Sequence, residues 1–275
     1  DYYSVTEEIA QRVEREEKKN AQLQKTIQDR KEKVNFFANK GGKMRKLAKK
    51  MRDEIAESEE NMVDVRREDK TIRDFNIAAQ DISGAIVTIN TVNVIINHEM
   101  VAKPKEIILR KRQKLLISGP NGIGKSTFLR SLVSGKNSGA VILPEVNVGC
   151  YSQDFANLDF SQTVYDSLDS ARMSDFGAND MRSVAAGFLL SGELMGHRVG
   201  DLSEGQKGLL AFARLVLMKP GLLILDEPTN HINFRHIPVI AKALNEYQGT
   251  MIMISHMEEF VKEIKMDEFL ELDKI

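Results

Sequence analysis

The 275-residue sequence lacks several features that secreted and membrane proteins carry. It has one cysteine, Cys150, so an internal disulfide is excluded and a reducing compartment is expected. No apolar run approaches the roughly 18 residues of a membrane-spanning helix, and no signal-peptide pattern is present. We therefore expect a soluble, cytoplasmic protein without a membrane partner, with Cys150 as a small buried side chain in a strand.

Proline is absent from residues 5–68, which are dense in Glu, Lys, Gln and Arg. Apolar residues recur there at spacings of three and four, which is typical of amphipathic helices. The pair Gly41-Gly42 separates two such stripes, and glycine pairs break helices. We predict that residues 1–78 form an antiparallel α-helical coiled-coil hairpin that links domains, with one long helix as the alternative.

The predicted bend of this hairpin is strongly basic, although the net charge of the whole chain is −1. Between Arg30 and Arg52 there are ten basic residues and one acid, Glu32. Like charges at the end of an arm repel one another, so a polyanion is the expected partner. The residues expected to bind RNA are Lys40, Lys43, Arg45, Lys46, Lys49, Lys50 and Arg52.

The second domain, residues 79–275, alternates short β-branched runs with helical patterns. This alternation indicates an α/β fold with a mainly parallel sheet. Residues 85–96 and 106–109 are predicted as antiparallel strands. Strands are also predicted at residues 115–118, 146–151, 222–225 and 251–254, with 115–118 as a buried parallel strand and 222–225 as a buried strand.

A glycine-rich loop follows the predicted strand 115–118 and leads into a predicted helix. Its sequence, G-P-N-G-I-G-K-S-T, fits the phosphate-binding pattern G-x-x-x-x-G-K-[ST]. The glycines allow backbone N–H groups to turn toward phosphates, and the helix N-terminus adds partial positive charge. Lys125 is predicted to reach the β- and γ-phosphates, and Ser126 to bind Mg²⁺. The predicted nucleotide-binding residues are Gly119, Pro120, Asn121, Gly122, Ile123, Gly124, Lys125, Ser126 and Thr127.

Two acids, Asp226 and Glu227, follow the apolar run 222–225. If this strand lies beside the phosphate-binding loop in the sheet, its end delivers both carboxylates to the phosphates. We expect Asp226 to lie by the metal ion. We expect Glu227 to accept a proton from the attacking water or to orient it.

Three further motifs carry a resemblance to a known family. Residues 202–206, L-S-E-G-Q, precede an apolar-striped helix and closely resemble the LSGGQ signature of ATP-binding-cassette (ABC) ATPases. Gln153 falls where that family has its Q-loop, and His256 where it has its switch histidine. The string D-E-P-T-N-H at residues 226–231 matches the ABC-F class, in which two cassettes are joined by a long two-helix linker that reaches toward tRNA on the ribosome. The sequence resembles the linker and second cassette of such a translation factor.

The resemblance implies a P-loop ABC ATPase core, with a mixed, mainly parallel sheet, an antiparallel β subdomain and a helical subdomain. It also implies Mg²⁺-dependent hydrolysis of ATP, with catalytic roles for Lys125, Gln153, Glu227 and His256. The implied metal ligands are Ser126, Gln153 and Asp226. By the same resemblance, an opposing cassette (a missing N-terminal half or a second copy) holds the ATP that is bound by Ser203, Gly205 and Gln206.

The sequence departs from the family at three places. No aromatic residue that could stack on adenine lies near Ile96, Glu204 replaces a glycine of the signature, and Ile232-Asn233 replace the usual Leu-Asp. Since the chain starts without Met and ends just after an apolar run, we also expect a piece of a longer protein. Two histidines outside the motifs, His197 and His236, are expected at the surface.

Two other functions compete with a ribosome-associated ATPase. The ATP-binding subunit of a membrane transporter has a longer helical region between Q-loop and signature, and has no use for the hairpin. In an SMC- or Rad50-like DNA ATPase, the coiled coil interrupts the cassette between P-loop and signature, whereas here it precedes the whole cassette. The ribosome, contacted through tRNA or rRNA, is therefore the predicted partner.

Overall fold

The computed structural model describes residues 27, 34, 55, 71–96, 99–136 and 139–275, and divides into one unit up to Lys70 and a second from Thr71. In the first unit, Ile27, Val34 and Ile55 are each helical and buried, and they form a small apolar cluster. Residues 71–78, the last of the predicted hairpin, are not helical, and Ile72 and Ile77 pack in a core of the second unit instead. The other residues of the predicted hairpin, including its basic bend and every residue expected to bind RNA, lie outside the described residues.

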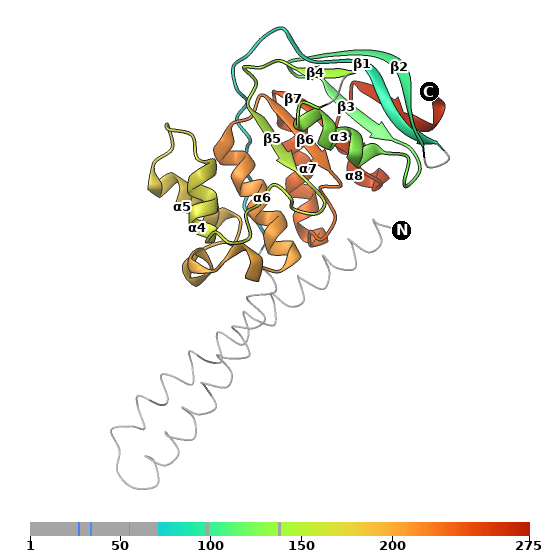
Figure 1. Ribbon diagram of the computed structural model, residues 1–275. Helices are drawn as coiled ribbons and strands as arrows, with labels where there is room; N and C mark the ends of the chain where they lie inside the picture. The colour runs from blue at the N-terminus through green and yellow to red at the C-terminus, as the bar shows by residue number, and fades with distance from the viewer. Residues whose placement is uncertain (1–26, 28–33, 35–54, 56–70, 97–98, 137–138) are drawn as a thin grey trace. The chain divides into compact units, whose positions relative to one another are not determined.

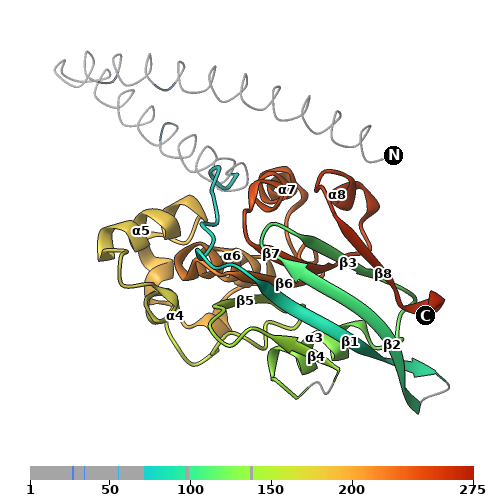
Figure 2. The same cartoon turned by 90° about the horizontal axis from the view of Figure 1, so that it is seen from above.

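The second unit contains a three-stranded antiparallel sheet, ordered β2-β1-β4, and a five-stranded parallel sheet, ordered β5-β6-β7-β3-β8 (Figures 1 and 2). The antiparallel strands are β1 Ala85–Ile96, β2 Glu99–Arg110 and β4 Ala140–Ile142. The parallel strands are β3 Lys114–Ser118, β5 Val148–Tyr151, β6 Leu222–Asp226, β7 Thr250–Ile254 and β8 Glu268–Glu271. The predicted α/β fold, with a mainly parallel sheet and antiparallel strands, is confirmed.

Six helices surround these sheets in the described part of the chain, joined by short 3-10 segments. The helices are α3 Lys125–Val133, α4 Val164–Ala171, α5 Ala178–Gly187, α6 Glu204–Met218, α7 Ile237–Glu246 and α8 Glu258–Lys262. The 3-10 segments are η1 Gly192–Gly196, η2 Val199–Asp201, η3 Phe234–His236 and η4 Leu272–Lys274. None of the helices in this part of the chain is long and apolar enough to cross a membrane.

Alternate side chains of the central strands belong to two different cores. Leu222 and Ile224 of β6 pack in the core that holds α3 and β1. Leu223 and Leu225 pack in the core that holds α6 and α7. Successive side chains of a strand point to opposite faces, and here both faces are buried. This is why the strand appears in the sequence as an uninterrupted apolar run.

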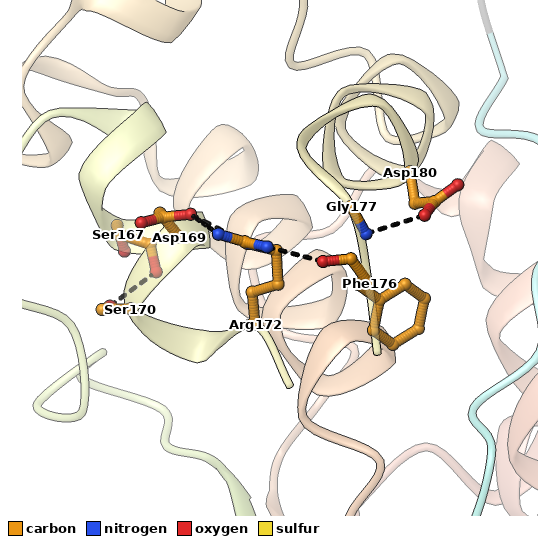
Figure 3. A network of polar contacts seen from close by, with 7 residues as sticks. All are labelled: Ser167, Asp169, Ser170, Arg172, Phe176, Gly177 and Asp180. Carbon is orange, nitrogen blue, oxygen red and sulfur yellow. Dashed lines mark hydrogen bonds and ion pairs between the residues drawn. The ribbon is translucent and has the colours of Figure 1, made fainter. Parts of the chain in front are cut away.

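A polar network ties the end of α4 to the start of α5 (Figure 3). Arg172 donates from Nε to Oδ1 of Asp169 at 2.8 Å and from Nη1 to the carbonyl of Phe176. Gly177, the N-cap of α5, donates its N–H to Oδ2 of Asp180 at 2.8 Å. These bonds occupy both ends of the connection and so fix the turn between the two helices.

The second antiparallel strand is longer than predicted: β2 begins at Glu99, whereas the predicted strand covered residues 106–109. β2 lies at the edge of its sheet, where proline is tolerated, and Pro104 pairs with Thr91 next to a shift of register. Proline and the register shift together interrupt the apolar alternation that marks a strand in the sequence.

The expectation that His236 lies at the surface was wrong. Its side chain is buried, and the N–H of Ile72 points to its Nδ1 at 3.5 Å. Burial lowers the pKa of His236, so the ring is neutral at physiological pH. His197 is exposed, as expected. In β5, burial raises the pKa of the Cys150 thiol to about 11, which leaves it protonated and unreactive at neutral pH.

Candidate active site

The glycine-rich loop connects β3 to α3 and lies against the end of β1. Gly124 is the N-cap of α3 with φ 104°, and a Cβ atom on it would lie 3.4 Å from Cγ1 of Ile95. Ile95 also donates its backbone N–H to the carbonyl of Ile123 at 2.9 Å. The left-handed backbone favours glycine at position 124, and Ile95 packs at ordinary van der Waals distance from it.

Lys125 is buried at the centre of this loop. Its Nζ donates to the carbonyl oxygens of Gly119 at 2.7 Å and of Pro120 at 3.0 Å. The loop therefore folds around its own ammonium group, which is the arrangement that concentrates positive charge where phosphates are bound.

The two carboxylates at the end of β6 are buried and incompletely paired. Asp226 is 5% exposed and Glu227 is 6% exposed. Oδ1 of Asp226 and Oε1 of Glu227 have no hydrogen-bond partner. Burial raises the pKa of Asp226, and a hydrogen bond from Ser126 opposes this shift. Because an unpaired buried carboxylate is costly, these oxygens indicate a site for a cation and for a proton donor.

The residues after β7 hold Glu227 in place. Glu227 has φ 50° and donates its N–H to the carbonyl of Ile254 at 2.9 Å. The backbone N–H of His256 donates to Oε2 of Glu227 at 3.1 Å. The ring Nε2 of His256 lies 3.4 Å from Oε1 of Glu227.

A cavity of about 640 Å³ brings these groups together, and its size suits a small-molecule ligand. Its lining includes the predicted site residues Asn121, Gly122, Gly124, Lys125, Ser126, Thr127, Gln153, Asp226, Glu227 and His256. They come from the segments that follow β3, β5, β6 and β7, the edge where ligands bind in open parallel sheets. Gly119, Pro120 and Ile123 do not line the cavity but accept the hydrogen bonds of Lys125 and Ile95 described above.

Sequence reasoning missed three lining residues, Ile95, Asn230 and Ile254. Asn230 donates its N–H to the carbonyl of Glu227 at 3.0 Å, and the turn closed by this hydrogen bond brings Asn230 back toward the glycine-rich loop and the cavity. Its place in the D-E-P-T-N-H string was the available signal. Ile95 precedes Ile96, the position near which an aromatic residue that stacks on adenine would be expected. Within the described chain, the lining of this cavity contains one ring, the imidazole of His256.

The predicted signature residues Ser203, Gly205 and Gln206 do not line this cavity. Ser203 is the N-cap of α6: its N–H donates to Oε1 of Gln206 at 3.0 Å, and its Oγ accepts from the N–H of Gln206 at 3.3 Å. This capping box uses the Gln206 side chain inside its own helix. The structure thus separates the signature from the cavity that holds the other predicted residues.

The donor set at the cavity fits Mg²⁺ accompanied by phosphates. No group of three or more His, Cys, Asp and Glu side chains that could hold a metal ion by itself occurs among the described residues. Mg²⁺ is usually bound through one or two carboxylates together with substrate phosphates and water. Asp226, with the Ser126 hydroxyl and the Gln153 amide, provides such a partial set.

Known proteins similar to this chain include several ATP-binding-cassette proteins of the F family. The family model described as "ABC transporter" matches residues 103–230. ABC transporter F family member 5 of Arabidopsis thaliana is 32% identical over 185 residues, which cover 66% of this chain and 27% of the relative. ATP-binding cassette sub-family F member 3 of Mus musculus is 32% identical over 153 residues, which cover 54% of this chain and 21% of the relative. The chain thus spans less than a third of either relative.

A solved structure shows the same fold at lower identity. It is the complex of the archaeal ribosomal stalk protein aP1 with the archaeal ribosome recycling factor aABCE1. The match has a TM-score of 0.52 at 20% identity and covers 71% of this chain and 38% of that one. At this identity the likeness concerns the fold alone.

Proposed function

We propose that this chain, which belongs to the ABC-F class of ATP-binding-cassette ATPases, binds and hydrolyses Mg-ATP as one cassette of a ribosome-associated translation factor. The observation that carries the proposal is the convergence of Lys125, Asp226, Glu227 and His256 on one cavity. A buried ammonium for phosphates and a fixed, partly unpaired carboxylate are the parts that phosphoryl transfer to water requires.

In this proposal the backbone of the loop and Lys125 bind and orient the β- and γ-phosphates. Ser126, Gln153 and Asp226 would hold Mg²⁺, which neutralises phosphate charge when bound. Oε1 of Glu227 accepts the proton of the attacking water, because it is the carboxylate oxygen without a hydrogen bond. His256 keeps Glu227 in this orientation through its backbone N–H and faces the γ-phosphate with its ring.

We further propose that a second cassette completes the site. Ser203, Gly205 and Gln206 lie outside the cavity of their own cassette, which supports a role toward the ATP of an opposing one. The chain alone would then form productive sites only where two copies meet. Turnover per molecule should rise with protein concentration, and a rate per molecule that stays constant on dilution would contradict this part of the proposal.

We also propose that the partner of this chain is the cytoplasmic ribosome, and that the basic bend binds its tRNA or rRNA. It is supported by the ten basic residues between Arg30 and Arg52 and by the ABC-F class of the cassette. Co-sedimentation tests it directly. The Glu227→Gln chain with Mg-ATP should pellet with ribosomes, and should not associate with lipid vesicles or duplex DNA. Association with vesicles alone would favour a transporter subunit instead.

A further inference from the structure

The signature segment and the segment after β6 meet in a close polar contact between two side chains. Nδ1 of His231 lies 2.7 Å from Oε2 of Glu204. Glu204 stands where the ABC signature has glycine, and His231 is the last residue of the D-E-P-T-N-H string. The pair therefore joins the two motifs within one cassette.

The backbone around this pair leaves little room for additional side-chain atoms. A Cβ atom on Gly205 would lie 3.1 Å from the carbonyl oxygen of His231, and one on Gly208 would lie 2.6 Å from Cδ1 of Ile232. His231 itself has φ 64°, a left-handed conformation that is uncommon for residues other than glycine. The first turn of α6 thus rests directly on the turn that contains His231.

The same turn carries the carboxylate of the active site. The N–H of Asn230 donates to the carbonyl of Glu227 at 3.0 Å, and the N–H of Ile232 donates to that of Thr229 at 3.3 Å. Residues 227–232 therefore form consecutive short turns, with Glu227 at one end and His231 near the other. Only three residues, Pro228, Thr229 and Asn230, separate His231 from Glu227 within these turns.

A third segment also reaches His231. The Phe155 ring lies 6.3 Å from the His231 ring, centroid to centroid, and Phe155 follows Gln153 by two positions. The His231 imidazole thus meets the signature at Glu204 and the Gln153 loop at Phe155, and the His231 backbone belongs to the Glu227 turn. This makes His231 a junction of the three segments that bear predicted site residues.

We propose that Glu204 and His231 form a positioning pair, which sets the Glu227 turn according to the position of the signature segment. The inference rests on the proposed function, in which the signature faces the ATP of an opposing cassette. A signature engaged by that ATP then fixes, through Glu204 and His231, the carboxylate that acts on the chain's own ATP. Glu204 therefore provides a contact that glycine at this position could not make. Neither Glu204 nor His231 touches the reacting atoms.

The test compares Glu204→Gly, Glu204→Gln and His231→Asn in the full chain, with kcat, KM and the affinity for a fluorescent ATP analogue as readouts. Asparagine is chosen at position 231 because it tolerates a left-handed backbone. Glu204→Gly and His231→Asn should each lower kcat by about fivefold, which corresponds to the loss of one partly exposed polar contact. KM and ATP affinity should change less than about twofold. Glu204→Gln should recover part of the loss because its amide oxygen still accepts a hydrogen bond.

Two further measurements complete the design. The double variant Glu204→Gly/His231→Asn should be no slower than either single variant, since both remove one contact. Asp81→Gly breaks the exposed Lys111–Asp81 pair, 2.6 Å long, and should leave kcat unchanged. Three results would each overturn the inference while the proposed function stands. They are an unchanged kcat in all pair variants, a decrease in kcat of the double variant equal to the combined decreases of the single variants, or a change in KM with no change in kcat. A wild-type chain that does not hydrolyse ATP would overturn both.

Discussion

His256 contacts Glu227 from the segment that follows the neighbouring strand: its backbone N–H donates to Oε2 at 3.1 Å, and its ring Nε2 lies 3.4 Å from Oε1. Glu227 directly follows β6 and His256 comes shortly after β7, and these two strands pair in parallel. The register of the sheet therefore sets the distance between the two residues. A carboxylate held in this way needs no reorganisation before it accepts a proton.

Glu227→Gln should separate hydrolysis from binding. The amide keeps the size of the side chain but cannot accept the proton, so kcat should fall by about 100-fold or more while ATP affinity changes little. Lys125→Ala should instead lower ATP affinity by about tenfold or more, because it removes a charged hydrogen-bond donor to phosphate. Phosphate release and fluorescent-nucleotide titration measure the two effects. Equal loss of binding in both variants would refute this division of roles.

Asp226→Asn should stabilise the fold and remove the response to Mg-ATP. The carboxylate is buried, and its Oδ1 lacks a hydrogen-bond partner, so a neutral amide should raise the free energy of unfolding by about 1 kcal/mol. That corresponds to a rise in Tm of about 3 °C for a domain of this size. Mg-ATP should raise the Tm of the wild-type chain but not of the variant. A variant that melts below the wild-type chain would show that Asp226 is structural.

Lys114→Met should destabilise the fold by about 2 kcal/mol. Lys114 is 4% exposed, and its Nζ donates to the carbonyls of Leu244 at 2.9 Å and Asn245 at 2.7 Å, near the end of α7. Methionine leaves both carbonyls without this charged donor. Urea unfolding measures the loss, with the exposed Lys262→Met as control. A neutral effect of Lys114→Met would mean that water replaces the ammonium.

The same lysine gives a pH dependence with a defined sign. Burial lowers the pKa of Lys114 below its ordinary value of 10.5, so the folded chain holds this proton less tightly than the unfolded chain. The resulting penalty is fully present below the lowered pKa and disappears as the pH rises toward 10.5. The stability advantage of wild type over Lys114→Met should therefore grow as the pH rises from the lowered pKa toward 10.5. A constant difference would contradict the lowered pKa.

The phosphate-binding loop and the parallel strands were predictable because their signals are local. A buried strand such as 222–225 must be apolar at every position, and the glycines of the loop mark its backbone directly. What the sequence concealed depends on distant contacts. His236 has both a charged neighbour, Arg235, and an apolar one, Ile237, in the sequence, and its burial involves Ile72 from a distant part of the chain. Asn230 enters the cavity through a turn whose direction no spacing rule supplies.

Glu204, in the signature segment, is a second residue whose role depends on a distant contact. In the sequence it is a glycine position occupied by an acid, which suggests repulsion from a triphosphate. In the structure its carboxylate pairs with His231, and the charge is engaged within the cassette. Pairwise contacts between segments that are separated in the sequence have no periodic signature, so the favourable role of Glu204 was not predictable.

Reversing the charge of the predicted bend should abolish ribosome association and leave the cassette intact. The variant replaces Lys43, Arg45, Lys46, Lys49 and Lys50 with Glu. If about half of the ten basic residues contact phosphate, log K for the wild-type chain should fall with log[salt] at a slope of roughly −4 to −5. Sedimentation at several salt concentrations measures this slope, and nucleotide titration checks the cassette.

A matched control carries the same number of reversals on the cassette. It replaces Lys105, Arg110, Lys136, Lys262 and Lys265 with Glu. This control should retain ribosome binding with its salt slope unchanged. If the arm variant also binds with an unchanged slope, the basic bend is a solvated spacer and the RNA contact lies elsewhere.

The contact of Ile95 with the glycine-rich loop bears on how this cassette can be dissected or transplanted. The segment matched by the family model, residues 103–230, contains the loop and Glu227 but begins after Ile95 and ends before β7 and His256. A fragment cut to those limits would still contain the sequences of the glycine-rich loop and of the segment with Glu227. It would lose the residue that packs against Gly124 and the strand that lies between β3 and β6. The shortest transferable unit therefore runs at least from β1 to His256, and the motifs do not delimit it.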